Sequence, residues 1–306
     1  MKLFYNGADI YDDVSVNYCV HEMFAEKQAD TLVIRFNDTK GVWSKWNPAT
    51  GDTIRFVEGA SDTGKMFVHS MKPENGLFTI RAMSIPQSGT TKRSKSWEGV
   101  RFLQLGNEIA KNHGLEFQNY GCADQLYPYI KQENETDFAF YSRLCMLEGC
   151  AMIVYNGKLL VYNEQYIEKQ APAGTLDVDI NGIFSYKDNR AACYGSCEVA
   201  SGRFIGKFNA PNAVNTSVLR PERPIKTNSN AEAVRFAKGL LRNANKYGRT
   251  GQFSKELQLG YAAASIMKLN TKKASAWDGT VFVYKVRHDF VGNKSTLYFR
   301  DLLEGY

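Results

Sequence analysis

Hydrophobic and polar residues alternate in short runs through residues 1–85, and this pattern predicts β-strands. Within one run, Leu32, Ile34 and Phe36 fall on the same side of a strand, which should therefore face a core. Clusters of Asn, Asp, Gly and Pro separate the runs, which are residues 18–20, 31–36, 53–57, 65–69 and 77–81. Closely spaced strands with such turns predict a small barrel or sandwich.

The middle of the chain changes to a helical pattern. Apolar residues recur at helical spacing through residues 102–110, and the helix should end at residues 112–114, where Gly114 suits a left-handed terminus. A second helix is expected from about residue 134 to residue 148, with Asn134 as its cap. Because apolar side chains cover most of its circumference, this helix should be buried.

A tight hairpin should follow the second helix. Residues 151–155 and 158–162 are apolar runs separated by Asn156 and Gly157, and Asn-Gly between such runs is the strongest short hairpin signal. Polar residues then extend from 164 to 174 and mark a boundary between units. The middle unit is therefore expected to be helix, loop, helix and hairpin.

The C-terminal part should return to β structure around one further helix. Ser229, with Glu232 three residues later, forms a capping box for a helix over about residues 229–247. Strands are expected at residues 183–186, 192–194, 203–208, 255–260, 265–269, 279–286 and 295–300.

Basic residues fill the polar faces of this third helix around one apolar stripe. They are Arg235, Lys238, Arg242 and Lys246. A solvated face is the simpler interpretation of these charges. The alternative is that the basic face meets an acidic neighbouring subunit, because charge can orient an assembly.

An internal echo links the two β regions. Residues 64–71 followed by 77–82 are similar to residues 279–286 followed by 296–301. Two β units that share a closing hairpin would follow from a duplication, and a true internal repeat constrains the architecture strongly.

Length and charge narrow the class of protein. At 306 residues, 43% hydrophobic and 23% charged, the chain should form two or three globular units. No apolar run approaches a membrane span, and the first residues are too polar for a signal peptide, so folding in a cytoplasm is expected. The net charge of +6 is scattered. The cluster Lys92-Arg93-Ser94-Lys95 reads as a solvated linker, and no sequence-specific nucleic-acid binding is predicted.

Candidate chemistry is sparse. The four histidines lie in separate units, and Glu133, Glu135 and Asp137 are better explained as helix-start charges than as a glycosidase pair. Cys193 and Cys197 lack the further ligands that zinc requires, and Cys122 should be one of six reduced thiols. The sequence therefore predicts no catalysis, no metal site and no cofactor.

Two tryptophans lie on a loop between early strands. Exposed on that loop, Trp43 and Trp46 would suggest a site for a sugar or a partner. A packed corner is the commoner use of such large aromatic residues, and we favour it.

Several segments occur in an order that resembles a known family. They are Trp97-Glu98-Gly99 and residues 109–115, 132–140, 143–144, 149–151 and 156–159. In this order they resemble the baseplate hub (late control protein D) family of phage tails and contractile injection machines. Trp277-Asp278-Gly279 and Arg287-His288 also match the family's pattern near the end of its second barrel.

The resemblance implies an α+β fold, mainly β, in which two tail-tube-like β-barrels flank a small α/β domain. The implied units are residues 1–90 for the first barrel, 91–168 for the α/β insert and 169–306 for the second barrel with its inserted helix. The candidate interface or structural residues are Trp43, Trp46, Trp97, Asn156, Gly157, Arg235, Lys238, Arg242 and Trp277.

The function implied by the resemblance is structural. A homotrimer of such chains would present six barrels in a ring and so join a sixfold tail tube to a threefold spike. The implied partners are the tail tube protein, the spike protein, other baseplate proteins and, as a further candidate, the tape measure protein. The implied location is the virion tail baseplate, assembled in the bacterial host cytoplasm. Whether the tail contracts, and whether the particle is infectious or bacteriocin-like, stays open.

A second class of function also stays open at this point. The chain could be a surface module of a phage or cell that holds glycans through Trp43, Trp46 and tyrosines. The two interpretations differ in assembly, because a hub should form trimers or co-assemble with tail proteins and a glycan binder need not.

Overall fold

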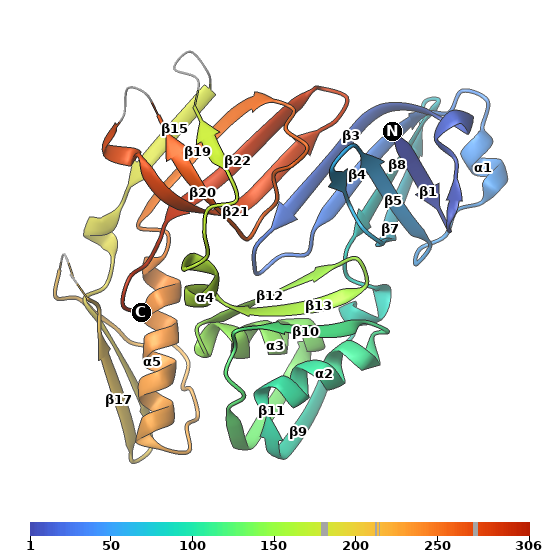
Figure 1. Ribbon diagram of the computed structural model, residues 1–306. Helices are drawn as coiled ribbons and strands as arrows, with labels where there is room; N and C mark the ends of the chain where they lie inside the picture. Colours follow the sequence, from blue (N-terminus) through green and yellow to red (C-terminus); the bar gives the residue numbers. More distant parts are fainter. Residues whose placement is uncertain (179–182, 212, 214, 272–274) are drawn as a thin grey trace.

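The computed structural model describes residues 1–178, 183–211, 213, 215–271 and 275–306. Figure 1 shows two β units side by side at the top, with a mixed insert and the long helix α5 below them. The fold is α+β and mainly β, as the sequence predicted.

The first β unit is built from strands whose buried faces carry the alternating apolar residues of the sequence. Leu32, Ile34 and Phe36 are all buried in its core, on the predicted side of their strand. The pairing order is β3-β4-β8-β7-β5-β1-β2, with β6 against β5. The elements are β1 (Lys2–Tyr5), β2 (Ala8–Asp9), η1 (Tyr11–Asp13), β3 (Ser15–Phe24), β4 (Thr31–Asn37), α1 (Val42–Trp46), β5 (Thr53–Glu58), β6 (Ser61–Asp62), β7 (Met66–Glu74), β8 (Leu77–Met83) and η2 (Gln87–Thr90).

The second β unit repeats this arrangement. Its pairing order is β15-β19-β22-β21, with β20 against β21 and β14 against β20. The elements are β14 (Thr175–Asp177), β15 (Ile183–Asp188), η3 (Arg190–Ala192), β19 (Arg249–Glu256), β20 (Ser265–Asn270), η4 (Ser275–Trp277), β21 (Gly279–Asp289) and β22 (Lys294–Asp301). Two expected strands are corrected. Residues 192–194 form no strand, because Ala192 is the last residue of η3 and the next two residues are irregular. The strand expected at 255–260 is β19, which begins earlier, at Arg249, and ends at Glu256.

The two β units share one sheet. Strand β21 pairs antiparallel with β3, so their strands form a continuous 14-stranded sheet. The described pairings follow an open path, whereas two separate barrels were expected. Each unit is therefore one half of a larger sheet.

The insert between the halves contains two small sheets and three helices. Its elements are β9 (Lys92–Arg101), α2 (Phe102–Asn112), β10 (Glu116–Tyr120), β11 (Leu126–Thr136), α3 (Asp137–Leu147), β12 (Cys150–Tyr155), β13 (Lys158–Asn163) and α4 (Glu164–Glu168). Strand β9 pairs with β11, and β10 and β12 flank β13. The predicted hairpin is confirmed as β12 and β13, and α3 is buried as expected.

Two expectations in the insert were wrong. The basic cluster at 92–95 lies in β9 and is no linker, because the strand pairs with β11 while its side chains stay exposed. Asn134 does not cap a helix. It lies in β11 with φ +48°, at an irregularity of the ladder, and Thr136 caps α3 by accepting a hydrogen bond from the Ala139 amide.

Helix α5 (Asn230–Asn245) packs on a small sheet made of β16 (Ser196–Ser201), β17 (Phe204–Asn209) and β18 (Val218–Leu219). Ser229 caps it by accepting a hydrogen bond from the Glu232 amide, as predicted, while the Glu232 carboxylate accepts from the Asn228 amide. Gly206 fits directly under the helix, because a Cβ there would lie 2.2 Å from the Ala233 carbonyl carbon.

Candidate functional site

The joint between the two β units is one candidate site, because it holds the halves of the sheet together. His288 of β21 lies opposite His21 of β3, and both side chains are fully buried. His288 is satisfied: Nδ1 lies 2.8 Å from Ser295 Oγ and Nε2 lies 3.0 Å from the Tyr261 carbonyl. Among the residues that the structure describes, neither ring nitrogen of His21 finds a hydrogen-bond partner. The joint therefore buries one imidazole whose loss of hydration is not compensated by hydrogen bonds.

Burial makes this joint sensitive to acid. Burial, helped by the nearby charge of His288, lowers the pKa of His21 to about 3, and burial also lowers the pKa of His288. The unfolded chain binds a proton at His21 below about pH 6.5, whereas the folded chain does not until about pH 3. As far as His21 is concerned, the folded state is therefore not destabilised above about pH 6.5, and its unfolding free energy falls as the pH drops from 6.5 towards 3.

We predict that His21→Met removes part of the acid sensitivity. Between pH 7 and pH 5, protonation of His21 in the unfolded state should lower the unfolding free energy of the native chain by about 2 kcal/mol. The drop in the variant over the same pH range should be smaller by about this amount. Urea unfolding followed by circular dichroism at both pH values measures the difference. His69→Met controls for loss of a histidine as such, and an unchanged pH dependence in His21→Met would contradict the assignment.

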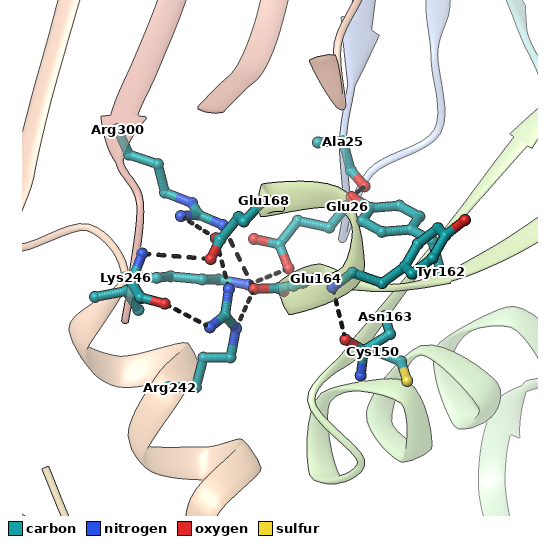
Figure 2. Close-up of polar contacts among 12 residues, drawn as sticks. Ala25, Glu26, Cys150, Tyr162, Asn163, Glu164, Glu168, Arg242, Lys246 and Arg300 are labelled. Carbon is teal, nitrogen blue, oxygen red and sulfur yellow. Dashed lines mark hydrogen bonds and ion pairs between the residues drawn. The ribbon is translucent and has the colours of Figure 1, made fainter. Parts of the chain in front are cut away.

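A second candidate site is a buried charge cluster where the three units meet (Figure 2). Glu26 comes from the β3–β4 loop, two carboxylates come from α4, two cations from the end of α5 and its C-cap, and one cation from β22. We call this set the central charge cluster, and its members are Glu26, Glu164, Glu168, Arg242, Lys246 and Arg300. Its three carboxylates and three cations balance in charge.

Glu164 contacts all three cations of this cluster. Its carboxylate lies 2.8 Å from Arg242 Nε, 2.7 Å from Lys246 Nζ and 3.5 Å from an Arg300 nitrogen. Burial alone would raise the pKa of Glu164, but Lys246, Arg242 and Arg300 outweigh it and lower that pKa to about 2. Glu164 of the insert thus binds α5, its C-cap and β22, and Glu26 of the first unit joins the cluster through Lys246.

The other members extend the network, in which each charged group has at least one partner of opposite charge. Glu168 lies 2.5 Å from an Arg242 nitrogen and 2.7 Å from Arg300 Nη1. Lys246 also reaches Glu26 at 2.5 Å. The Arg300 guanidinium stacks over the Phe282 ring at 4.3 Å. Charges buried this deeply are tolerated only when each has such partners.

We predict that Glu164→Gln destabilises the chain by about 3 kcal/mol or more, because three buried cations would then face two carboxylates. Glu133→Gln is the matched control, since Glu133 forms an exposed pair with Lys131 and its loss should leave the unfolding free energy nearly unchanged. Urea unfolding at pH 7 measures both. Equal effects of the two substitutions would show that the central charge cluster does not hold the units together.

These contacts correct the interpretation of the basic face of α5. Arg242 and Lys246 are 2% and 3% exposed and are paired within the chain, so they are neither solvated nor free for a neighbouring subunit. Arg235 Nε binds the Glu148 carboxylate at 2.7 Å, and the Lys238 ammonium lies over the Phe208 ring at 5.5 Å. The acidic partners of Arg235, Arg242 and Lys246 therefore lie within the same chain, in the insert and, through Glu26, in the first β unit.

The Asn-Gly turn of the insert contacts the first β unit. Asn156 (φ +46°) and Gly157 (φ +75°) adopt the conformation that the tight hairpin requires. Asn156 Oδ1 accepts a hydrogen bond from the Lys65 amide at 3.2 Å, and the Tyr155 hydroxyl donates to the Asp62 carbonyl at 3.0 Å. The turn therefore helps to place the insert against the first unit.

The two loop tryptophans have different roles. Trp43 is 1% exposed and stacks on Phe78 with ring centroids 5.4 Å apart, which confirms the packed-corner interpretation for this residue. Trp46 packs edge-on against Trp43 but remains 43% exposed. Only Trp46 of this pair offers a surface to a ligand.

We predict that Trp43→Ala lowers the unfolding free energy by about 3 to 5 kcal/mol, because it empties a core position. Trp46→Ala should cost less than about 1 kcal/mol because its ring is half in solvent. Thermal unfolding of the two variants side by side measures the contrast. A large loss in Trp46→Ala would mean that its exposed ring supports the core after all.

The two other tryptophans are half-buried. Trp97 stacks on Phe140 at 5.2 Å and donates its ring N–H to Glu108 at 3.1 Å. Trp277 stacks on Tyr186 at 4.8 Å, and the Arg249 guanidinium lies 4.1 Å from its ring centre. Each braces one unit, β9 on α3 and η4 on β15.

One hydrogen-bonded chain was missed at the sequence level. Ser88 Oγ lies 2.8 Å from His113 Nδ1, and His113 Nε2 lies 2.9 Å from an Asp137 oxygen. The residue types match a hydrolytic triad, yet the His113 side chain is only 1% exposed and packs on Phe138, so a substrate has no approach to the imidazole. The arrangement joins the end of α2 to the start of α3. It also gives Asp137 partners beyond the helix dipole.

The remaining candidate chemistry stays structural. All six cysteines are free thiols, and Cys122 is buried as expected. Within the described residues, no group of three or more His, Cys, Asp or Glu side chains has the arrangement of a metal site. Among the helices that the structure describes, none combines the length and the apolar character of a membrane-crossing segment.

Comparison with known proteins gives a sequence relative. A segment of 148 residues, 44% of this chain, is 30% identical to the probable baseplate hub protein of Escherichia phage 186. This match spans 36% of the length of that curated relative. A search of protein-family models found no match.

Solved structures share the fold at low sequence identity. A 43 kDa tail protein of prophage MuSo2 from Shewanella oneidensis has a TM-score of 0.76 at 9% identity, covering 98% of this chain and 97% of its own. An Escherichia coli component of the type VI secretion system has a TM-score of 0.66 at 12% identity, covering 100% of this chain and 78% of its own. The chain therefore has the fold of phage tail proteins and resembles the baseplate hub family in sequence.

Proposed function

We propose that this chain is a structural hub protein of a phage tail baseplate or a phage-tail-like particle. The observation that carries the proposal is the doubled β unit within one sheet, in a fold shared with phage tail proteins. Three copies would then supply six similar units around an axis. Such a ring can contact a sixfold tube on one face and a threefold spike on the other.

In this proposal the chain acts through its contacts. Its partners are two further copies of itself, the tail tube protein, the spike protein and other baseplate proteins, and its place is the virion baseplate. The proposed units are those expected from the sequence, at residues 1–90, 91–168 and 169–306. Support for a non-catalytic role comes from the inaccessible His113 and from Glu135 and Asp137, whose carboxylates are paired within the chain.

A closed ring also gives a use to the polar face of the sheet. A hollow of about 620 Å³ crosses β3, β4, β8, β7 and β21 on the side away from the core. Tyr18, Glu22, Arg35, Arg81 and Arg287 line it. In a ring of sheets this face would line the channel.

We predict that the chain forms trimers, alone or with its tube and spike proteins, because each copy has two β units and one axis must serve both symmetries. Light scattering coupled to size-exclusion chromatography measures the mass with and without those partners, and electron microscopy of the native particle locates the ring. A chain that stays a single copy in the particle would contradict the proposal.

The alternative is a glycan-binding module, and exposure of Trp46 is the observation that favours it. In that case Trp46→Ala should abolish retention on a glycan array and leave the copy number unchanged. A hub should also assemble normally in Trp46→Ala, but its native chain should show no specific retention on the array.

A further inference from the structure

The two β units are related strand by strand. In chain order, β1, β3, β4, β5, β7 and β8 correspond to β14, β15, β19, β20, β21 and β22, with the same neighbours in each half. The ladders β3–β4, β4–β8, β7–β8 and β5–β7 are antiparallel, and so are their counterparts. Only the outermost pair differs, since β1–β5 is antiparallel and β14–β20 is parallel.

The correspondence extends to single residues. The ladder of β7 with β8 shifts register at His69, and the ladder of β21 with β22 shifts at the corresponding Tyr284. From there both strands run to their last pair, Glu74 with Leu77 and Asp289 with Lys294. The sequence echo is thus real in β7 and β21. Its second half was misaligned by two residues, because Leu77 corresponds to Lys294 and not to residue 296.

Strand β21 uses its outer edge in two parts. Residues 279–283 pair with β20, and residues 285–289 pair with β3 of the other half. In β7 the first part is also used, because Met66 and Phe67 pair with β5. The second part, Ser70 to Glu74, has no ladder partner among the described strands on this side.

The strand that corresponds to β3 is also free on one side. Strand β15 ends the sheet path and pairs only with β19 among the described strands. Figure 1 places β15 in one β unit and β7 in the other. Two of its apolar side chains are exposed, Ile183 at 69% and Phe184 at 43%. An edge of this kind is a ready template for pairing with another chain.

We propose that β7 of one copy pairs antiparallel with β15 of the next copy, in the geometry that β21 and β3 already show within the chain. The partner is a second copy of this chain. The joint inside each chain and the joint between chains then alternate around a continuous sheet. The assignment rests on the proposed hub function, because a ring gives every copy a neighbour at both edges.

The internal joint sets the register of the joint between copies. Asp289 lies opposite Val20 and His288 opposite His21. Tyr18 of β3 pairs with Arg35 of β4, and Ile183 of β15 pairs with Ser254 of β19. Because Arg35 and Ser254 are corresponding positions of the two halves, Tyr18 corresponds to Ile183. Transferred to the free edges, this register places Glu74 opposite Ser185 and Pro73 opposite Tyr186.

Charges on the polar face distinguish the two joints. In the internal joint Glu22 binds Lys285 at 2.9 Å and lies 3.8 Å from Arg287. In the joint between copies, Lys72 falls opposite Lys187, a like-charge pair that weakens this joint relative to the internal one. Glu74 is the diagonal neighbour of Lys187 and offsets part of that repulsion. Glu74 already pairs with Lys72 at 2.5 Å, so one carboxylate would serve two lysines as Glu22 serves two cations.

Pro73 makes the joint between copies weaker than the internal one. The Phe290 amide donates to the Cys19 carbonyl and the Ala25 amide donates to the Tyr284 carbonyl, so alternate residues of β21, including His288, direct their backbone groups at β3. Pro73 is the counterpart of His288 and has no N–H to donate. The joint loses one ladder bond, and a proline also discourages this edge from pairing with unrelated strands.

A pair of cysteines tests the register. Glu74 and Ser185 would form a non-hydrogen-bonded pair, whose Cα atoms lie about 4.5 Å apart, within reach of a disulfide. Both positions are exposed in the single chain, so Glu74→Cys with Ser185→Cys should fold normally. In assembled particles this double variant should give about tenfold more intermolecular disulfide than either single variant, because the ring holds the two thiols together. Glu74→Cys with Glu133→Cys is the matched control.

The outcomes separate this inference from the proposed function. Trimers that carry the Glu74–Ser185 link in non-reducing gels and in mass spectrometry support both. Trimers that lack this disulfide overturn the strand pairing and leave the hub function standing. So do trimers in which the control double variant forms as much intermolecular disulfide as the test variant. Single copies without a link in the native particle overturn both.

Discussion

The backbone ladder between β21 and β3 is the constraint on which the rest of the structure depends. Antiparallel pairing fixes the spacing and register of the two halves, so their relation cannot vary continuously. The side chains at this ladder are as closely fixed, since His21 and His288 face each other without exposure to solvent. A slip of one residue would place the apolar face of one half on the same side of the sheet as the polar face of the other. The duplicated unit is thereby held as one rigid sheet and not as two domains on a linker.

The insert is positioned by different means. It adds no strand to the 14-stranded sheet, and it meets the halves through the central charge cluster, the Asn156 turn and an apolar contact that includes Ala25, Tyr162 and Phe282. Buried ion pairs add little net stability compared with apolar packing, but they tolerate few geometries because each charge must keep its partners. The central charge cluster therefore suits the task of orienting three units, with Glu164 joining the insert to the last unit and Glu26 joining the first unit through Lys246.

The sequence predicted local structure well and long-range pairing poorly. Alternation identified the strands around Leu32 and Phe36, and the Asn156-Gly157 turn and the Ser229 cap were found because each depends on a few neighbouring residues. The basic residues of α5 were misread because helical periodicity says which face is polar and not what covers it. The pairs of Arg242 with Glu164 and of His113 with Asp137 join residues 78 and 24 positions apart, and no local pattern encodes such contacts.

The differences between the halves show which edge of the repeat has been fitted to a permanent neighbour. At the position where β21 carries His288, buried and bonded to Ser295 and Tyr261, β7 carries the exposed Pro73. An edge that is always covered within one chain can bury a polar ring, because its partner is present from the moment of folding. If β7 pairs with a second copy as we propose, its edge must stay soluble until that copy arrives, and Lys72, Pro73 and Glu74 suit this at the expense of one hydrogen bond. The same backbone geometry can therefore serve a fixed joint and an assembly joint, with the side chains deciding which of the two it is.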